Sequence, residues 1–181
     1  MTDSNNKREI LQSLGTISAL VISILALIVS IFETNILKDQ QKATVWPYVT
    51  INQNYSGKGY ELRAINKGVG PAIIKSMQVE YKGKPMDTYL GMLEAAYPNN
   101  GRNYSNTNQS NINGMVMQSK EKVVMLAFPW NDTTYQITPE LEKNLVIKLQ
   151  YCSVLGECWY YEYPSEKRYE ADFKAQYEFQ N

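Results

Sequence analysis

Two cysteines have a spacing that points to a definite covalent chemistry. Cys152 and Cys158 bracket the turn-forming residues 153–157, and they stand at the facing ends of two segments, 145–151 and 158–163, that read as the strands of a hairpin. A disulfide between them would stabilise the fold by about 2 kcal/mol and would require an oxidising compartment. Two free thiols remain the alternative. The spacing does not suit a CxxC redox site, and two cysteines alone make a poor zinc site.

Other catalytic side chains are scarce. The sequence has no histidine, which removes the usual general base, the Ser-His and Cys-His nucleophile pairs and the commonest metal ligand. A glycosidase would need a pair of carboxylates, and the acids near the carboxyl end are Glu157, Glu162, Glu166, Glu170 and Asp172. Their spacing singles out no pair. We therefore predict a protein that is not an enzyme and has no metal or cofactor, with a carboxylate-based glycan hydrolase as a minor alternative.

The segment 66–72 (NKGVGPA) has the residues of a sharp turn. Asn66 can bond its own backbone, Gly68 and Gly70 permit positive φ, and Pro71 keeps Gly70 out of the helical region. A phosphate-binding glycine loop is the alternative, but no GK[ST] follows and the next segment reads as a strand rather than a helix. We predict a structural turn.

Aromatic side chains gather at the carboxyl end. They are Trp159, Tyr160, Tyr161, Tyr163, Tyr169, Phe173, Tyr177 and Phe179. Rings on alternating strand positions predict core and sheet-edge packing, and a sugar- or peptide-binding platform is the alternative. The Asn- and Ser-rich segment 98–114 predicts a long solvated loop, which is a second place where a ligand could make contact.

The elements that must position these residues are mostly strands. Segments 45–52 and 60–65 alternate on either side of a glycine-containing turn and predict a first hairpin. Further strands are expected at 73–82, 115–118, 122–128, 145–151 and 158–163. Two short helices are expected, one over 87–96 behind an Asp87 cap and one brief turn starting at Thr138-Pro139. The predicted fold class is mainly β: a single N-terminal transmembrane helix followed by an antiparallel β-sandwich-like domain with one or two short helices.

The longest apolar run extends from Leu14 to Phe32, about nineteen residues without a charge, which is the length a helix needs to cross a bilayer. Its Leu, Ile, Val and Phe side chains favour insertion by about 5 kcal/mol. The expected organisation is a cytoplasmic tail at 1–13, a transmembrane helix at 14–32, a helical stalk at 33–44 and the β domain at 45–181.

Residues 31–34 (IFET) after the run lack the small side chains of a signal peptidase site, so an uncleaved signal anchor is expected. Lys7, Arg8 and the terminal amine precede the span, whereas Lys38 and Lys42 follow it. The narrow excess of basic groups favours a cytoplasmic amino terminus and an extracytoplasmic β domain in a bacterial inner membrane. A disulfide would agree with this topology.

Small residues follow one face of the span. Gly15, Ala19 and Ser23 lie four residues apart, a spacing that lets two membrane helices approach closely. This face predicts a homo-oligomer formed through the helix. The alternative is that small residues are merely common in membrane spans.

Two motifs resemble those of a known group of proteins. A strand start at 46–48 (WPY) soon after an N-terminal span, followed by the turn at 66–72, resembles uncharacterised bacterial membrane-anchored proteins with a small β-sandwich-like domain. The resemblance covers the first half of the chain. It implies location and fold, and it brings no catalytic residue.

Charge and composition exclude one class of partner. Lys and Arg number 18, Asp and Glu number 18, and the net charge is +0, so we expect no basic face for nucleic acid. The sequence predicts a membrane-anchored, non-enzymatic binding or interaction module on the extracytoplasmic side. Its expected partners are the lipid bilayer and an unidentified protein or glycan. The alternative is a ligand sensor that faces the cytoplasm and is coupled to the membrane helix.

Overall fold

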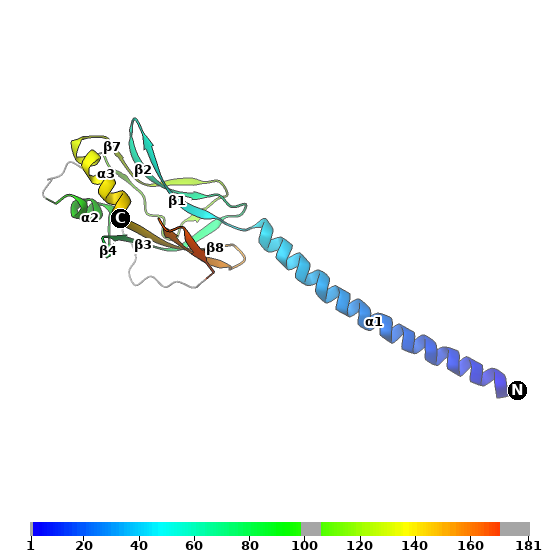
Figure 1. Ribbon diagram of the computed structural model, residues 1–181. Coiled ribbons are helices and arrows are strands. Elements are labelled where there is room, and N and C mark those ends of the chain that lie inside the picture. Colours follow the sequence, from blue (N-terminus) through cyan, green and yellow to red (C-terminus); the bar gives the residue numbers. More distant parts are fainter. Residues whose placement is uncertain (1, 99–105, 171–181) are drawn as a thin grey trace. The chain divides into compact units, whose positions relative to one another are not determined.

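The computed structural model describes residues 2–98 and 106–170, with side chains from residue 14 onward (Figure 1). The chain divides into two compact units, Met1–Ala43 and Thr44–Asn181. The first is formed by the helix α1 (Thr2–Thr44), and the second is an antiparallel β domain with two short helices. The predicted fold class, mainly β behind one long apolar helix, is confirmed.

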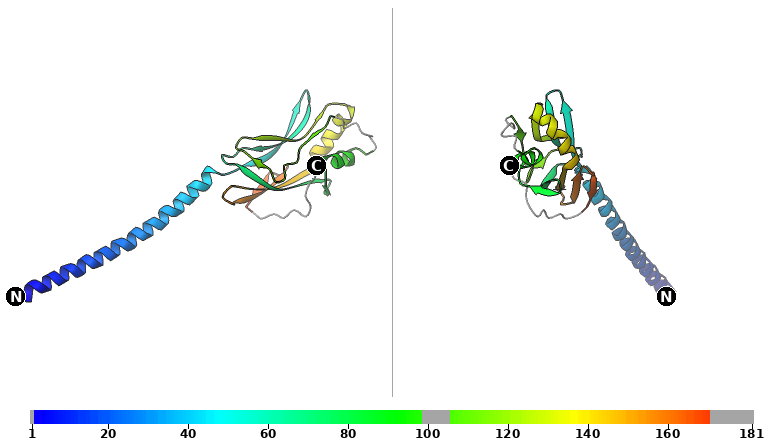
Figure 2. Two further views of the ribbon diagram at one scale, coloured as in Figure 1. Left: turned by 180° about the vertical axis from the view of Figure 1, so that it is seen from behind. Right: turned by 60° about the vertical axis from the view of Figure 1, so that its left-hand side comes forward.

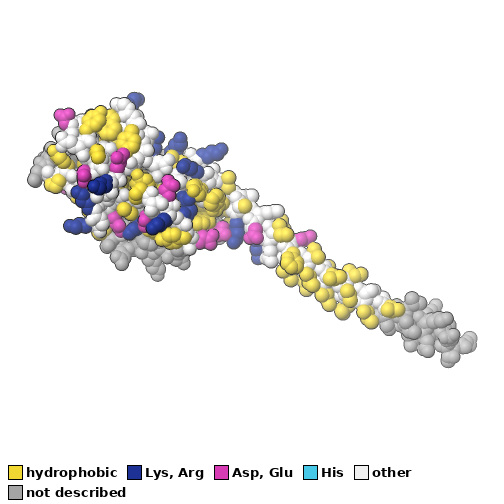
Figure 3. All heavy atoms as spheres, in the orientation of Figure 1, with side chains coloured by type: hydrophobic (Ala, Val, Ile, Leu, Met, Phe, Trp, Pro, Cys, Tyr) yellow, Lys and Arg dark blue, Asp and Glu magenta, His cyan; other side chains and the backbone are white. Residues whose placement is uncertain are grey.

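The side chains of α1 are exposed over the whole of Leu14–Thr44. On the face shown in Figure 3, hydrophobic side chains cover the helix along its apolar run, and charged side chains follow beyond it. The hydroxyls of Ser18, Ser23 and Thr34 donate to backbone carbonyls of the preceding turn at 2.8–2.9 Å, so these polar groups are satisfied inside the helix. Within the described residues, α1 is the one helix long and apolar enough to span a membrane.

The β domain consists of two antiparallel sheets that lie face to face (Figures 1 and 2). The first sheet has the order β1-β2-β7-β5, formed by Val49–Ser56, Gly59–Asn66, Lys122–Pro129 and Asn108–Gln109. The second has the order β10-β9-β8-β3-β4, formed by Lys167–Tyr169, Cys158–Tyr163, Leu145–Cys152, Ala72–Tyr81 and Lys84–Met86. A short strand β6 (Val116–Met117) also pairs with β3.

Alternating side chains of both sheets form the core. In β8, Leu145, Ile147, Leu149 and Tyr151 are buried while the intervening residues are half-buried, which is the period of two expected of a strand with one face on the core. The central strand β3 is buried more fully, and its register against β8 shifts between Ile74 and Ser76. Such a bulge changes which side chains point inward.

The two helices differ in detail from the sequence expectation. The helix α2 (Tyr89–Ala96) is capped by Thr88, whose hydroxyl accepts from the Gly91 N–H at 3.0 Å. The prediction that Asp87 caps this helix is therefore wrong. The helix α3 (Asp132–Asn144) is longer than the single turn expected, and it begins behind Asn131 rather than at Thr138. Pro139 lies inside it. The Thr138 hydroxyl donates to the Thr134 carbonyl within the helix at 2.8 Å, so it caps nothing.

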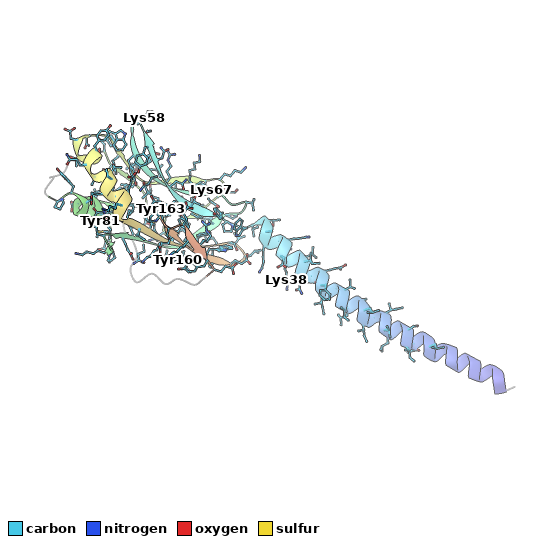
Figure 4. All side chains as sticks on the ribbon, in the orientation of Figure 1. Lys38, Lys58, Lys67, Tyr81, Tyr160 and Tyr163 are labelled. Carbon is cyan, nitrogen blue, oxygen red and sulfur yellow. A yellow bond between two sulfur atoms is a disulfide. The ribbon has the colours of Figure 1, made fainter. Side chains whose placement is uncertain are left out.

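The β domain has two distinct ends. At one end lie Val45, the turn at 66–71 and the loop 153–157, and Figure 4 labels Lys67 there. The opposite end has the tip of the β1–β2 hairpin, which carries Lys58, together with α2 and α3 (Figures 1 and 4). The β1–β2 register runs from Val49↔Asn66 to Ser56↔Gly59, so these ends are about 24 Å apart along the strands.

Candidate functional site

Three aromatic side chains from different elements stack at the hairpin end. Tyr55 comes from the end of β1, Trp130 follows β7, and Tyr135 lies in the first turns of α3. The ring centroids of Trp130 and Tyr135 are 4.7 Å apart with an interplanar angle of 14°, and those of Tyr55 and Trp130 are 6.4 Å apart at 7°. Tyr55 is 46% exposed and Tyr135 is 60% exposed. We call these three residues the aromatic ladder.

Hydrogen bonds fix the aromatic ladder in place. The indole N–H of Trp130 donates to the Ser56 carbonyl at 2.6 Å, and the Tyr55 hydroxyl bonds the Glu142 carboxylate. Burial, and then the hydrogen bond to and the negative charge of Glu142, raise the pKa of the Tyr55 hydroxyl well above its usual value. This hydroxyl is therefore a donor at every physiological pH.

A capping box holds the start of α3 between two of the rings. The Asn131 side chain accepts from the Thr134 N–H at 2.9 Å, and the Thr134 hydroxyl accepts from the Asn131 N–H at 2.7 Å. Two otherwise unpaired donors are satisfied by this reciprocal arrangement. The local sequence W-N-D-T-T-Y thus fixes Trp130 and Tyr135 relative to each other.

Buried rings support the aromatic ladder from beneath. Tyr60 stacks on Phe128 with centroids 4.8 Å apart, and it meets Tyr55 at 5.6 Å. Burial raises the pKa of Tyr60 well above its ordinary value and raises the pKa of Tyr163 to about 12. The exposed rings are thus continuous with the core.

The other face of the same hairpin holds a shallow hollow of about 170 Å³. Lys58, Asn106 and Asn108 are among its lining residues, and the small side chain of Ala127 lies between Glu61 and Asn108 in the strand register. Its lining combines the opposite charges of Lys58 and Glu61 with apolar residues such as Phe128 and Pro129. Since 170 Å³ is below the range of about 300–1,000 Å³ of small-molecule pockets, the hollow alone is too small for such a ligand.

The predicted turn at 66–72 is a structural hub rather than an anion site. Asn66 is fully buried; its side chain accepts from the N–H groups of Tyr48 (3.1 Å) and Gly68 (3.0 Å), and its amide donates to the carbonyl of Gly70 (2.8 Å). The amide also reaches the carbonyls of Met117 and Gln118, at 3.2 and 3.1 Å. The N–H groups of residues 67–70 all donate to protein oxygens. None of these four backbone N–H groups is left for an anion.

Glycine is needed at positions 68 and 70 for a different reason from the one predicted. Neither Gly68 nor Gly70 adopts positive φ. A Cβ at Gly68 would overlap the backbone of residues 46–48, and one at Gly70 would overlap Val45. The Trp46 carbonyl accepts from Val69 and Gly70 at 3.0 and 3.2 Å. The WPY segment therefore packs on the turn, and the strand expected from Val45 begins only at Val49.

The structure pairs Cys152 directly with Cys158 across β8 and β9, with sulfur atoms 2.05 Å apart and bonded. The loop between them has hydrogen bonds of its own, because the Ser153 hydroxyl accepts from the N–H groups of Leu155 and Glu157 at 3.2 Å. The pair lies at the end of the domain opposite the aromatic ladder, so the disulfide has no part in that surface.

Among the described residues, the carboxyl-terminal acids do not gather in a cleft. Glu162 accepts from the hydroxyls of Tyr160 (2.9 Å) and Ser165 (3.0 Å). Burial raises the pKa of Glu162, but these hydrogen bonds and the nearby lysines lower it, and the net pKa is below its ordinary value. Glu166 and Glu170 are exposed. Asp172 lies outside the described residues.

The carboxyl-terminal aromatics that the structure describes lie in the core and at the sheet edge, as predicted. Trp159, Tyr160 and Tyr161 are buried, and Tyr169 is an exposed edge residue stacked on Tyr160 at 4.7 Å. Phe173, Tyr177 and Phe179 lie outside the described residues, as do positions 99–105 of the expected loop. Gly15, Ala19 and Ser23 lie on α1 with exposed side-chain positions, and their self-association stays a prediction.

Sequence reasoning missed Trp130 and Tyr135. The available signal was the Asn-x-x-Thr cap between two aromatic residues, which marks a helix start with rings on both sides.

Within the described residues, no group of three or more His, Cys, Asp or Glu side chains could hold a metal ion. Comparison with protein-family models, curated proteins and solved structures finds no match for this chain. The resemblance to bacterial membrane-anchored proteins stays a prediction.

Proposed function

We propose that this chain is a membrane-anchored, non-enzymatic binding protein of the bacterial cell envelope, with its β domain on the extracytoplasmic side. One observation carries the proposal. The aromatic ladder is a rigid, partly exposed surface at the end of the β domain opposite Val45, the residue through which the domain continues from α1. Exposed Tyr and Trp side chains held in fixed positions are typical of binding surfaces.

The anchor is supported by the composition and exposure of α1. The segment Leu14–Thr44 reaches a mean hydropathy of 2.6 with none of its most apolar window buried, and both Ile22 and Phe32 are 65% exposed. Burying each such side chain is worth about 1.5–3 kcal/mol. A bilayer would supply that burial along the whole run.

Three features of the chain favour an uncleaved anchor with the β domain outside. The residues after Phe32 lack the small side chains of a cleavage site. Lys7 and Arg8 precede the run. The bonded pair Cys152–Cys158 fits an oxidising compartment. The same β domain facing the cytoplasm as a ligand sensor is the alternative, and reduced thiols in the cell would favour it.

The state of the carboxylates near the carboxyl end favours a binding function over a catalytic one. A glycosidase needs one carboxyl group with a raised pKa opposite a second carboxylate about 5–9.5 Å away. The pKa of Glu162 is instead lowered, and its oxygens are engaged by two hydroxyls. The sequence also has no histidine to act as a base.

Alkaline carbonate extraction of membranes from cells producing the full chain tests the anchor. The wild-type chain should stay in the membrane pellet. Two charges in the span, Leu20→Arg with Ile24→Arg, oppose insertion by about 6 kcal/mol, more than the about 5 kcal/mol that favours it, so that variant should leave the pellet. Gln40→Arg, on the same helix beyond the apolar run, is the matched control and should stay. Release of the wild-type chain would overturn the proposal.

A further inference from the structure

We propose that the aromatic ladder binds an uncharged carbohydrate, with a sugar ring lying against the open face of Tyr135. This inference rests on the proposed binding function and names the class of its ligand. The hairpin end of the domain provides both parts of such a site, a fixed apolar ring and a rim of hydrogen-bonding side chains.

The ring of Tyr135 is prepared for stacking. One of its faces is covered by Trp130, at 4.7 Å between centroids, yet the side chain is 60% exposed, so the remaining face is open to solvent. A pyranose presents a flat surface of C–H groups, and burying that surface on an aromatic ring removes apolar area from water. Because the capping box and the stack already hold Tyr135, little side-chain entropy is lost on binding.

The exposed face of α3 supplies the polar rim. Asp132, Tyr135, Pro139 and Glu142 are exposed and follow one another at helical spacing, so they share one face. The carboxylates can accept hydrogen bonds from sugar hydroxyls, and Glu142 is oriented by the Tyr55 hydroxyl. Pro139 adds an apolar ring beside Tyr135.

Charge and size decide the ligand class. The carboxylates of Asp132 and Glu142 are balanced at this end by Lys58 and Lys143, and balanced charge suits a neutral ligand rich in hydroxyls rather than an anionic polymer. A stable protein interface buries about 800 Å² on each side, spread over about 20–30 residues. Of the described residues at this end, the large apolar side chains that are exposed are Tyr55, Leu90 and Tyr135. That is a stripe suited to one or two sugar rings.

The test is a titration of the full chain in micelles of a detergent without a sugar headgroup. The probes are neutral β-linked oligosaccharides of glucose and of N-acetylglucosamine, with oligogalacturonate as the anionic comparison. Calorimetry measures the affinity, and tryptophan emission, to which Trp46 and Trp159 contribute along with Trp130, is a second readout. We expect a neutral probe to bind and oligogalacturonate to bind more weakly or not at all.

Substitutions at the ladder separate stacking from folding. Tyr135→Ala should weaken binding at least about tenfold, or about 1.4 kcal/mol, while Tyr135→Phe keeps the ring and should bind as the wild type. Tyr169→Ala is the matched control, because Tyr169 is also a stacked and exposed ring, 51% accessible, but lies on strand β10 rather than on α3. It should leave affinity unchanged.

Two results would overturn the inference. One is the absence of binding by every neutral probe, and the other is binding that Tyr135→Ala does not weaken. If no saccharide binds while a photocrosslinker at position 135 captures a defined protein, the surface belongs to a protein partner instead. Membrane retention of the same variants is measured separately, so failure of the carbohydrate site leaves the anchor proposal standing.

Discussion

At the scale of single residues, Asn66 connects more parts of the β domain than any other site residue predicted from the sequence. Its side chain joins the WPY segment, the turn that follows β2, and the segment at residues 117–118. Each buried polar partner left unpaired costs about 1–3 kcal/mol. Asn66→Ala should therefore lower the free energy of unfolding by at least about 3 kcal/mol, as measured by urea denaturation.

A second substitution at this position, Asn66→Asp, tests the hydrogen bonds that the Asn66 amide donates. The carboxylate keeps the two accepted bonds but faces three carbonyl oxygens, so its folded-state pKa should rise above the unfolded value of about 3.9. A raised acid pKa means that the folded state binds more protons, so the variant should lose stability relative to the wild type as pH rises from acid to neutral. Equal pH profiles for the two proteins would contradict this account of the turn.

Buried tyrosines predict how the domain responds to alkali. Burial raises the pKa of Tyr60 and Tyr89 well above the usual value and that of Tyr163 to about 12. Unfolded tyrosines ionise near pH about 10, so above that pH the unfolded state binds fewer protons and stability falls as pH rises. Tyrosinate absorbance should increase in two steps, with the second step coinciding with loss of the β-sheet circular dichroism. A single ionisation step during which the β-sheet signal is retained would contradict this prediction.

At the scale of elements, α3 shows a local conflict between sequence and structure. Pro139 lies in the helix interior with its ring exposed, where proline is about 3 kcal/mol less favourable than alanine because it lacks an N–H and clashes with the preceding turn. Pro139→Ala should raise the urea midpoint by an amount equivalent to about 1–3 kcal/mol. Gln136→Ala, also exposed on α3, should change it little. An unchanged or lower midpoint for Pro139→Ala would show that the ring packs usefully against its neighbours.

The strands were largely predictable and the ladder was not. Period-two alternation in β2 and β8 reports directly on which face is buried, so the hairpins and the mainly β class followed from the sequence. The start of α3 was missed because Thr138-Pro139 has the same residue types as a helix start, whereas the capping box at Asn131 and Thr134 is what operates. The local capping box places Trp130 beside Tyr135, but Tyr55 joins them only through the order of β1, β2 and β7 in the sheet, which no local pattern encodes.

The predicted self-association of α1 is also a property of one element. The Ser23 hydroxyl is bonded to the Ala19 carbonyl, so a second helix would pack here through small side-chain size rather than through that hydroxyl. Ala19→Ile with Ser23→Ile should abolish self-association of the span in a membrane two-hybrid assay, and Val21→Ile should not. Equal signals from all constructs would show that α1 is a passive tether.

At the scale of the whole molecule, the proposed anchor and the proposed binding surface belong to different compact units of the chain. Twelve residues of α1 follow Phe32, and at about 1.5 Å per residue they extend about 18 Å along the helix axis. Within the β domain, the aromatic ladder lies at the far end of the β-sheets from Val45.

The most direct test of this account is the side of the membrane on which the β domain lies. In a full-length chain with Cys152 and Cys158 replaced by serine, a single cysteine is introduced either by Lys58→Cys, at the exposed tip of the β1–β2 hairpin, or by Asn5→Cys, before the span. Intact bacterial spheroplasts are treated with a membrane-impermeant maleimide. We predict labelling at position 58 at once and at position 5 only after permeabilisation. Labelling at position 5 alone, or release of a chain that has lost residue 5, would contradict the account.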